Sequence, residues 1–375
     1  MWTAGFAYWL SMGTVSYTYA GYPLLVVLLS KVRPKSVAKA AIQPSVSVVV
    51  AAHNEAQNIG TKIENLLALD YPKEKLQIIV ASDGSTDETN SIVEAYADRG
   101  VVLVRLKQAR GKPSALNEAV SCATGDVVVF CDARQRVDAN AISALVACLA
   151  DPTVGSVSGE LHMEDTKGPG AYWKYEKVIR NAESRVGSVP GVTGALHAMR
   201  RSLFEPIPRD AILDDMFTPL QVMLRGYRVV FEPEAKAFDR EADTKDEFRR
   251  KARTLAGNYQ LLSYLPDLLN PLRNRIFWQF TSHKLLRLIC PFALVSLYLS
   301  NVVLVLSPSP GWPIYVISLG GQSVAYALAI YSQISGKSTG KAARLAHTFV
   351  VLNAAAVEGL RRYLRGDFTW TGSAN

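Results

Sequence analysis

Two long stretches of this sequence contain no charged side chain. They run from Trp2 to Ser30 and from Leu288 to Gly336. A helix needs roughly 20 apolar residues to cross a bilayer, so the first stretch can hold one spanning helix and the second can hold two. The segment SPSPG at 307–311 predicts a turn between those two helices. The first stretch lacks the basic start and the Ala-x-Ala-like cleavage site of a signal peptide, so we expect an uncleaved membrane helix.

Basic residues flank both stretches. They are Lys31, Arg33, Lys35 and Lys39 after the first, Lys284 and Arg287 before the second, and Lys337, Lys341 and Arg344 after it. Basic residues beside membrane helices stay in the cytoplasm, so we predict a multi-pass protein of the inner (plasma) membrane with a cytoplasmic middle part. The net charge of +8 fits contact with anionic lipid. The middle part has no basic stripe with interleaved aromatic residues, which is the pattern that would indicate nucleic-acid binding.

The middle part alternates strand patterns with helical patterns. Strands are expected at 45–55, 76–83, 101–106 and 126–130, and helices at 58–69, 89–100 and 113–123. Such alternation predicts an α/β fold of the Rossmann-like kind, with a mostly parallel sheet flanked by helices. The Val/Ile runs show no polar alternation, which is typical of strands buried on both faces.

Polar residues follow three of these strands. Asn54 and Glu55 follow the first, Asp83 ends the second, and Asp132 follows the fourth. Ligands of such sheets bind at the carboxyl ends of the strands, so we expect these side chains to share a site. Ordinary turn residues are the alternative for each one alone, because Asp and Asn are common in turns. That alternative accounts less well for all three together.

Four further motifs follow in order along the chain. They are "GKPSALNEA" at 111–119, "GVTGALHAMRR" at 191–201, "ILDD" at 212–215 and "FRRKARTLAGNYQ" at 248–260. Together with the strand ends, they resemble a processive family 2 glycosyltransferase with a GT-A catalytic domain. Cellulose, hyaluronan and poly-N-acetylglucosamine synthases belong to that group. The resemblance covers about residues 45–262, and the uncharged stretches around it match the group's usual membrane layout.

The resemblance implies a site for a UDP-sugar donor. Its expected donor-binding residues are Ala52, Asn54, Glu55, Asp83, Lys112, Arg134 and Arg250. Asp132 is expected to bind Mg²⁺ or Mn²⁺ on the donor diphosphate. The family usually has a second aspartate where this chain has Arg134, but such ions keep only one or two carboxylate ligands, so Asp132 can be enough. A surface lysine is the alternative for Lys112.

The resemblance also implies three catalytic residues. Asp215 is the expected general base, which takes the proton of the acceptor hydroxyl as that hydroxyl attacks the sugar. Asp214 stands beside it where the family usually has Glu, and Arg253 is expected to neutralise the leaving diphosphate. The alternatives are acids that only start a helix, and a basic helix that lies on the membrane surface.

The acceptor side rests on weaker signals. Gly194 and His197 are expected along the acceptor path, and the alternative is a turn and a strand with a buried histidine. Thr254 stands where the family has a tryptophan that stacks near the acceptor of polymer synthases. This difference weakens the expectation of processive synthesis.

We predict five parts along the chain: a membrane helix at 1–32, a GT-A domain at 40–265, an interfacial amphipathic helix at 266–284, membrane helices at 285–365 and a tail at 366–375. The uncharged run 345–357 is short for a span, so a third C-terminal helix either spans with polar ends or dips into the surface.

The expected function is inverting transfer of sugar from a UDP-sugar to a growing polysaccharide, coupled to its export. The partners implied are the donor, the polysaccharide, the bilayer and export or secretion proteins. One alternative is the addition of a single sugar to a lipid-linked acceptor. Another is a membrane protein that binds nucleotide sugar without turnover.

Overall fold

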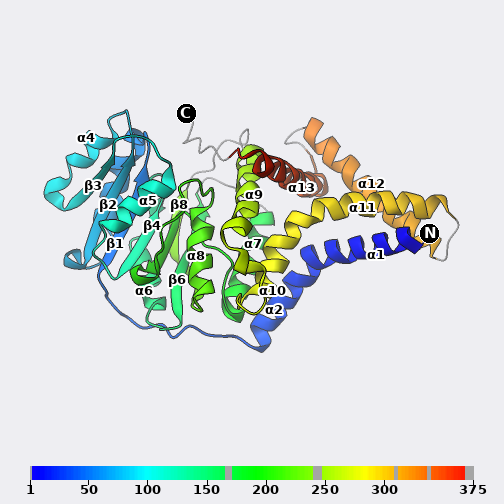
Figure 1. The fold of residues 1–375 in the computed structure, drawn as a ribbon, viewed down its shortest axis with the longest axis horizontal. Coiled ribbons are helices and arrows are strands. Elements are labelled where there is room, and N and C mark those ends of the chain that lie inside the picture. The colour runs from blue at the N-terminus through cyan, green and yellow to red at the C-terminus, as the bar shows by residue number, and fades with distance from the viewer. Residues whose placement is uncertain (1, 165–170, 240–246, 308–310, 336–338, 368–375) are drawn as a thin grey trace. The chain divides into compact units, whose positions relative to one another are not determined.

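The computed structural model describes residues 2–164, 171–239, 247–307, 311–335 and 339–367 (Figure 1). The chain divides into two compact units, which we describe separately. The described residues of the sheet unit fall within Leu29–Ala242 and Gln260–Phe277. Those of the helical unit fall within Met1–Leu28, Asp243–Tyr259 and Trp278–Asp367.

The sheet unit contains an eight-stranded sheet in the order β3-β2-β1-β4-β7-β6-β8-β5. The strands are β1 (Val46–Ala52), β2 (Leu76–Asp83), β3 (Val101–Leu106), β4 (Val127–Cys131), β5 (Arg136–Val137), β6 (Val154–Met163), β7 (Leu196–Arg200) and β8 (Arg228–Asp239). β1 to β4 are parallel, as are β6 and β8, whereas β7 is antiparallel to both β4 and β6. The predicted α/β fold with a mostly parallel sheet is confirmed.

Helices accompany this sheet. They are α3 (Ala56–Leu67), α4 (Thr89–Glu94), α5 (Lys112–Ser121), α6 (Ala141–Cys148), α7 (Ala171–Val186) and α8 (Asp214–Leu224). The helix predicted over 89–100 is shorter, because α4 ends at Glu94 and a separate 3₁₀ turn spans Ala97–Arg99. Gly100 ends that turn at φ +80°, a left-handed conformation that favours glycine.

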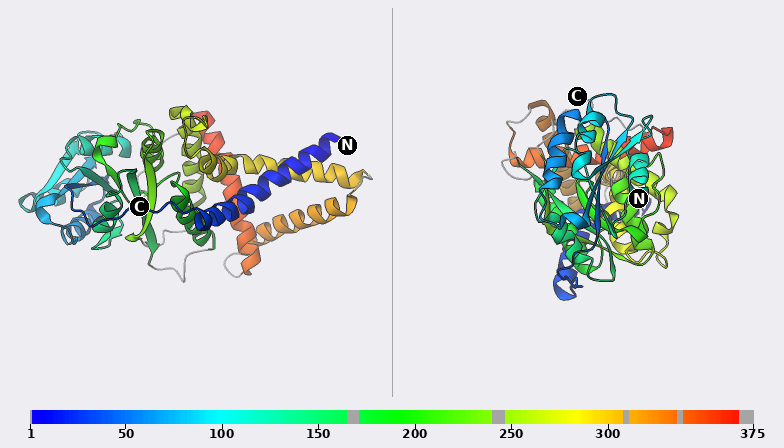
Figure 2. Two further views of the ribbon diagram at one scale, coloured as in Figure 1. Left: turned by 90° about the horizontal axis from the view of Figure 1, so that it is seen from below. Right: turned by 90° about the vertical axis from the view of Figure 1, so that its left-hand side faces the viewer.

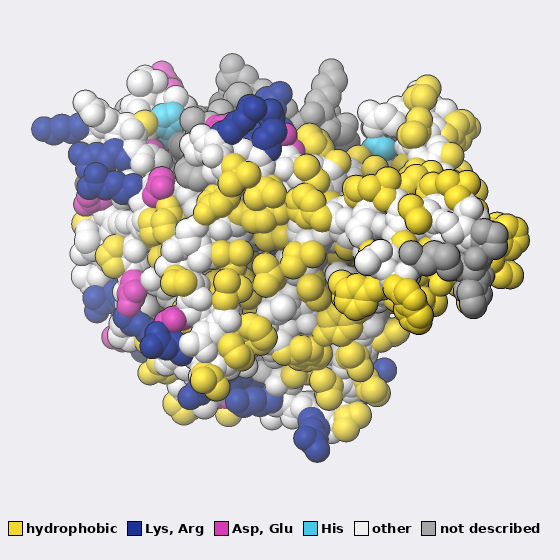
Figure 3. Space-filling view, turned by 45° about the vertical axis from the view of Figure 1, so that its right-hand side comes forward, with side chains coloured by type: hydrophobic (Ala, Val, Ile, Leu, Met, Phe, Trp, Pro, Cys, Tyr) yellow, Lys and Arg dark blue, Asp and Glu magenta, His cyan; other side chains and the backbone are white. Residues whose placement is uncertain are grey.

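The helical unit contains three helices that are long and apolar enough to cross a membrane. They span Trp2–Val32, Phe277–Leu306 and Trp312–Ser335, which agrees with the one and two spans expected from the uncharged stretches. Within them lie α1 (Trp2–Ser16), α2 (Tyr22–Val32), α10 (Phe277–Phe280), α11 (Leu286–Leu306) and α12 (Trp312–Ser335). Figure 2 shows α1, α11 and α12 side by side. Leu28, Val295 and Ile317 are among the exposed large hydrophobic side chains of this unit. Figure 3 shows a broad hydrophobic surface on one face of the molecule.

The helix α13, Lys341–Arg365, also belongs to this unit, and it runs across α11 and α12 (Figure 2). It is the third C-terminal helix that the run 345–357 predicted. It is not one of the three helices apolar enough to span. The predicted turn at 307–311 and the tail at 366–375 lie mostly outside the described residues.

The structure differs from the interfacial helix expected over 266–284. A 3₁₀ turn covers Pro266–Leu269, and the helix begins only at Phe277, continuing through a π-helical turn into α11. Asn270 precedes a proline and is extended, as proline demands of the residue before it. The Asn274 side chain then accepts from the backbone N–H of Ile276 at 3.0 Å, which stabilises a turn rather than a helix.

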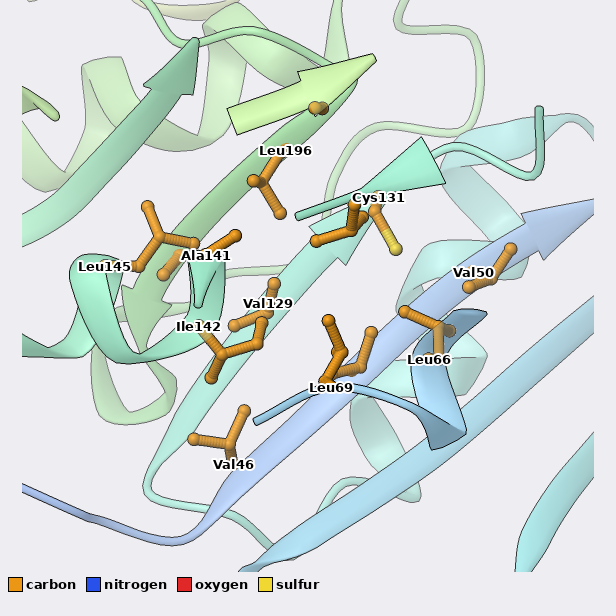
Figure 4. Close-up of a cluster of buried hydrophobic side chains, with 14 of the residues drawn as sticks. Val46, Val50, Leu66, Leu69, Val129, Cys131, Ala141, Ile142, Leu145 and Leu196 are labelled. Atoms are coloured by element: carbon orange, nitrogen blue, oxygen red, sulfur yellow. The ribbon is translucent and has the colours of Figure 1, made fainter. Parts of the chain in front are cut away.

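The core that holds the site lies between the sheet and its helices (Figure 4). Its strands contribute fully buried valines such as Val50 and Val129. On α3, Ile59, Ile63 and Leu66 are fully buried, with the i, i+4, i+7 spacing of a helix that buries one face. This packed core therefore holds the carboxyl ends of β1, β2 and β4 in position independently of the loops that follow them.

Gly84 follows β2 and allows the 107–111 loop to approach. Its φ is +62°, and a Cβ atom placed on it would lie 2.3 Å from the backbone nitrogen of Ala109 and 2.6 Å from the carbonyl carbon of Gln108. Only glycine avoids both the backbone strain and this clash. The loop that leads into Lys112 is therefore seated directly on the end of β2.

We expect Gly84→Ala to lower the free energy of unfolding by roughly 2–5 kcal/mol, the sum of left-handed strain and overpacking. The matched control is Gly100→Ala. Gly100 also has a positive φ, but a Cβ atom there meets nothing within 4 Å, so it should cost only roughly 1–2 kcal/mol. Denaturant unfolding of both variants tests this, and equal losses would show that the loop yields to the new methyl group.

Candidate active site

Two of the predicted acids meet beside a single glycine. Asp132 follows β4, whereas Asp215 lies in the first turn of α8. A Cβ atom placed on Gly194 would lie 3.5 Å from Asp215 Oδ2 and 3.7 Å from Asp132 Oδ2. The loop 191–195 precedes β7, and β7 pairs with β4, so the antiparallel strand inserted beside β4 brings the two carboxylates together.

Lys112 lies between the acids. Its Nζ donates to Asp132 Oδ1 at 2.8 Å and lies 3.2 Å from Asp214 Oδ2. Burial alone would lower the pKa of Lys112, but the carboxylates of Asp132, Asp214 and Asp215 outweigh it and raise that pKa. The ammonium therefore stays charged at neutral pH and holds an otherwise repulsive set of acids together.

Asp83 anchors the loop that leads to this lysine. It is 1% exposed. Its Oδ1 accepts from the backbone N–H of Arg110 at 2.7 Å, and its Oδ2 accepts from that of Gly111 at 2.8 Å. Asp83 thus positions the start of α5, a role that the sequence did not predict. Its expected contact with the nucleotide stays a prediction.

The end of β1 is tied to the loop after β2. Asn54 has a φ of +54°, and its Oδ1 accepts from the backbone N–H of Thr86 at 2.9 Å. The backbone N–H of Glu55 donates to Thr89 Oγ1 at 2.8 Å. Ala52 is buried at the end of the strand. Such hydrogen bonds are typical of turn residues. The donor-binding roles of the three residues stay predictions.

The roles expected of the three arginines stay predictions. Arg134 is exposed, and within the described part of the chain it makes no ion pair. Arg250 and Arg253 lie on α9 (Glu247–Tyr264), in its portion that belongs to the helical unit. Thr254, in the place of the family's tryptophan, donates its hydroxyl to the Arg250 carbonyl at 3.0 Å.

His197 is a core residue beneath the acids. It is 3% exposed, and its ring stacks on Phe130 with centroids 4.8 Å apart. Burial lowers its pKa to about 4 despite the opposing charge of Asp214. The neutral ring lies 3.1 Å from the Thr193 carbonyl through Nδ1, which places the proton on that nitrogen. This burial agrees with the alternative of a buried histidine, and the acceptor role stays a prediction.

The low pKa of His197 makes stability depend on pH. The unfolded chain binds a proton near pH 6.5, while the folded chain resists it until about pH 4, so stability falls as the pH drops through that window. At pH 5 the expected loss is about 2 kcal/mol. Unfolding of the His197→Phe variant should show a pH dependence between 7 and 5 that is shallower by this amount. Parallel curves would contradict the assignment.

The donor set fits a divalent ion that binds together with phosphate. Among the described residues, no group of three or more His, Cys, Asp and Glu side chains could hold a metal. The carboxylate of Asp132 instead meets that of Asp215 at Gly194, and Asp132 is the one expected to bind the ion. Mg²⁺ typically uses one or two carboxylates, with water and phosphate oxygens as its other ligands. The site is therefore suited to a shared ion rather than a closed protein cage.

The mixed, mostly parallel sheet with carboxylates at its strand ends agrees with the GT-A-like fold that the resemblance implied. Residues 47–207 match Glycosyl transferase family 2. The chain therefore carries a glycosyltransferase family 2 domain, which confirms the resemblance seen in the motifs.

Two curated relatives and one solved structure are similar to this chain. The probable glycosyltransferase YdaM of Bacillus subtilis is 29% identical over 264 residues, 63% of this chain and 60% of its own length. The poly-beta-1,6-N-acetyl-D-glucosamine synthase of Staphylococcus aureus is 26% identical over 244 residues, 62% of this chain and 58% of its own. The chain thus spans about three fifths of these relatives.

The solved structure is similar over almost the whole chain. It is the mannosyltransferase PcManGT from Pyrobaculum calidifontis in complex with GDP-Man and Mn²⁺. The match has a TM-score of 0.73 at 25% identity and covers 96% of this chain and 99% of the other. The likeness therefore extends beyond the sheet to the helices of the chain.

Proposed function

We propose that this protein transfers a sugar, with inversion, from a nucleoside diphosphate sugar to a hydroxyl group of a growing polysaccharide at the membrane. The observation that carries the proposal is the meeting of Asp132 and Asp215 at Gly194. One carboxylate can hold the donor side while the other faces the acceptor. Lys112, which pairs with Asp132 and Asp214, supplies a cation for the diphosphate.

In the proposed reaction, Asp215 accepts the proton of the acceptor hydroxyl. The oxygen attacks the anomeric carbon from the face opposite the diphosphate, the new C–O bond forms, and the bond to the diphosphate breaks. Lys112 faces the oxygen that gains charge, and Asp214 keeps this ammonium in place. A divalent ion held by Asp132 would supply further positive charge to the diphosphate.

The donor is the finer part of the proposal. UDP is expected from the family resemblance, and the synthase relative is named for a polymer of N-acetyl-D-glucosamine. GDP-mannose is the competing donor, because the similar mannosyltransferase was solved with GDP-Man and Mn²⁺. We place the enzyme in the plasma membrane with its sheet unit in the cytoplasm, since basic residues flank the candidate spans.

A second candidate function is the transfer of a single sugar to a lipid-linked acceptor. Thr254 in place of the stacking tryptophan favours it. So does the likeness over 96% of the chain to the mannosyltransferase PcManGT, which is not named as a polymer synthase. Coupling to export then has no role.

Membranes that contain the full chain test both candidates. They are incubated with labelled UDP-GlcNAc, UDP-glucose or GDP-mannose and Mn²⁺, and the products are sized. A ladder or high polymer supports polysaccharide synthesis, and one sugar on an extractable lipid supports the second candidate. Tight nucleotide-sugar binding with no product from any donor would overturn both and favour a binding protein without turnover.

A further inference from the structure

The loop 191–195 borders the two acids Asp132 and Asp215. The backbone N–H of Val192 donates to the carbonyl of Asp215 at 3.2 Å, and Gly194 faces the carboxylates of Asp132 and Asp215. The position of this loop therefore sets the position of the proposed base. A residue that holds this loop from its other side therefore also helps to set the position of Asp215.

Ser158 on β6 holds the loop. Its hydroxyl oxygen accepts from the backbone N–H of Thr193 at 3.1 Å and from Arg180 Nη2 at 2.8 Å. The same hydroxyl donates to the Gly159 carbonyl at 3.0 Å. A hydroxyl offers one donor and two acceptor sites, so all three are used. Ser158 is fully buried and acts as a junction between α7 and the loop.

Arg180 supplies the charged end of this chain of hydrogen bonds. It lies on α7, with its guanidinium 5.2 Å from the centre of the Phe231 ring. Burial lowers the pKa of Arg180, whereas the carboxylates of Glu176, Glu183 and Asp215 oppose that shift. An arginine keeps its charge under such conditions. The sequence did not reveal it, because α7 carries no strand-end or glycine motif.

We infer that Arg180 is a positioning residue for sugar transfer: through Ser158 it fixes the loop 191–195, whose Val192 N–H holds the backbone of Asp215. This inference rests on the proposed function, in which Asp215 is the base. Because Arg180 acts on the base and not on the donor, its loss should affect catalysis without affecting nucleotide binding.

The test uses the full chain in membranes or detergent, with the donor found active in the screen. We expect Arg180→Gln to lower kcat by about 10- to 100-fold, the usual effect of a small misplacement of a reacting group. The Kd for the nucleoside diphosphate and the KM for the donor should stay within about twofold, since neither depends on the base. Arg180→Lys, which keeps the charge, should recover part of the loss, and Ser158→Ala should reproduce most of it.

Arg200→Gln is the matched control. Arg200 is also partly buried, but its side chain donates, among the described residues, to the carbonyls of Leu149, Asp151 and Val154. Its loss should lower the melting temperature with kcat unchanged. Equal effects on kcat in Arg180→Gln and Arg200→Gln, or an unchanged kcat in Arg180→Gln, would overturn the inference. An active Asp215→Asn variant would instead overturn the proposed base, so the two failures are distinct.

Discussion

Replacing Asp215 with asparagine is expected to lower the rate of sugar transfer by about 10²–10⁴-fold, the usual contribution of a general base. The amide keeps the shape of the side chain and the contacts of the first turn of α8 but cannot take a proton. Donor binding should stay close to that of the unchanged protein. Initial rates with labelled donor, together with calorimetric binding of the nucleoside diphosphate, measure both quantities.

Asp98→Asn is the control for this experiment. Asp98 is an exposed acid in the 3₁₀ turn Ala97–Arg99. Its replacement changes the net charge by the same amount and leaves the acids at Gly194 unchanged. It should leave the transfer rate unaltered. Full activity in Asp215→Asn would remove the base from the proposal, and the case for inverting transfer at Gly194 would lose its main support.

Replacing Asp132 with asparagine should lower transfer by about 10²–10³-fold, the scale on which a preorganised electrostatic contact acts. Two consequences combine here. Lys112 loses its 2.8 Å partner, and the expected ion on the diphosphate loses its protein ligand. We expect the Mn²⁺ concentration required for half-maximal activity to rise, and a chelator to stop transfer by the unchanged protein.

The control for Asp132 is Asp138→Asn. Asp138 lies six positions on and accepts from the backbone N–H of Asn140 at 3.1 Å, so its change tests the loss of an acid near the same strand. It should not alter the Mn²⁺ dependence. If a chelator leaves the unchanged protein fully active, the metal is not required and Lys112 alone serves the diphosphate.

Much of the sheet could be predicted because its signal is local. The valine runs of β1, β2 and β4 form buried parallel strands, and polar residues follow each of them. A strand buried on both faces must be apolar along its whole length, and this leaves a mark in the sequence itself. The three candidate membrane spans could be predicted for the same reason.

The helix expected over 266–284 was wrong for its first half, and this error was also local in origin. Aromatic and basic residues there suggested an interfacial helix, but Asn270 before a proline and the side-chain bond of Asn274 favour turns. The backbone preferences of these two asparagines decided the local structure, whereas the composition of the whole segment did not.

The sequence by itself determined the class of fold, the candidate membrane helices and the acids at 132 and 215. Each depends on neighbours in the chain: a run of one polarity, a carboxylate at the end of a strand, or, for Asp215, a short motif that resembles the family's. Only the tertiary structure decided that Lys112 bridges two acids, that Asp83 holds a loop, and that Arg180 reaches Thr193 through Ser158. These contacts join residues that are far apart along the chain. Their strength depends on burial and on distances and angles between atoms, which no local sequence pattern records.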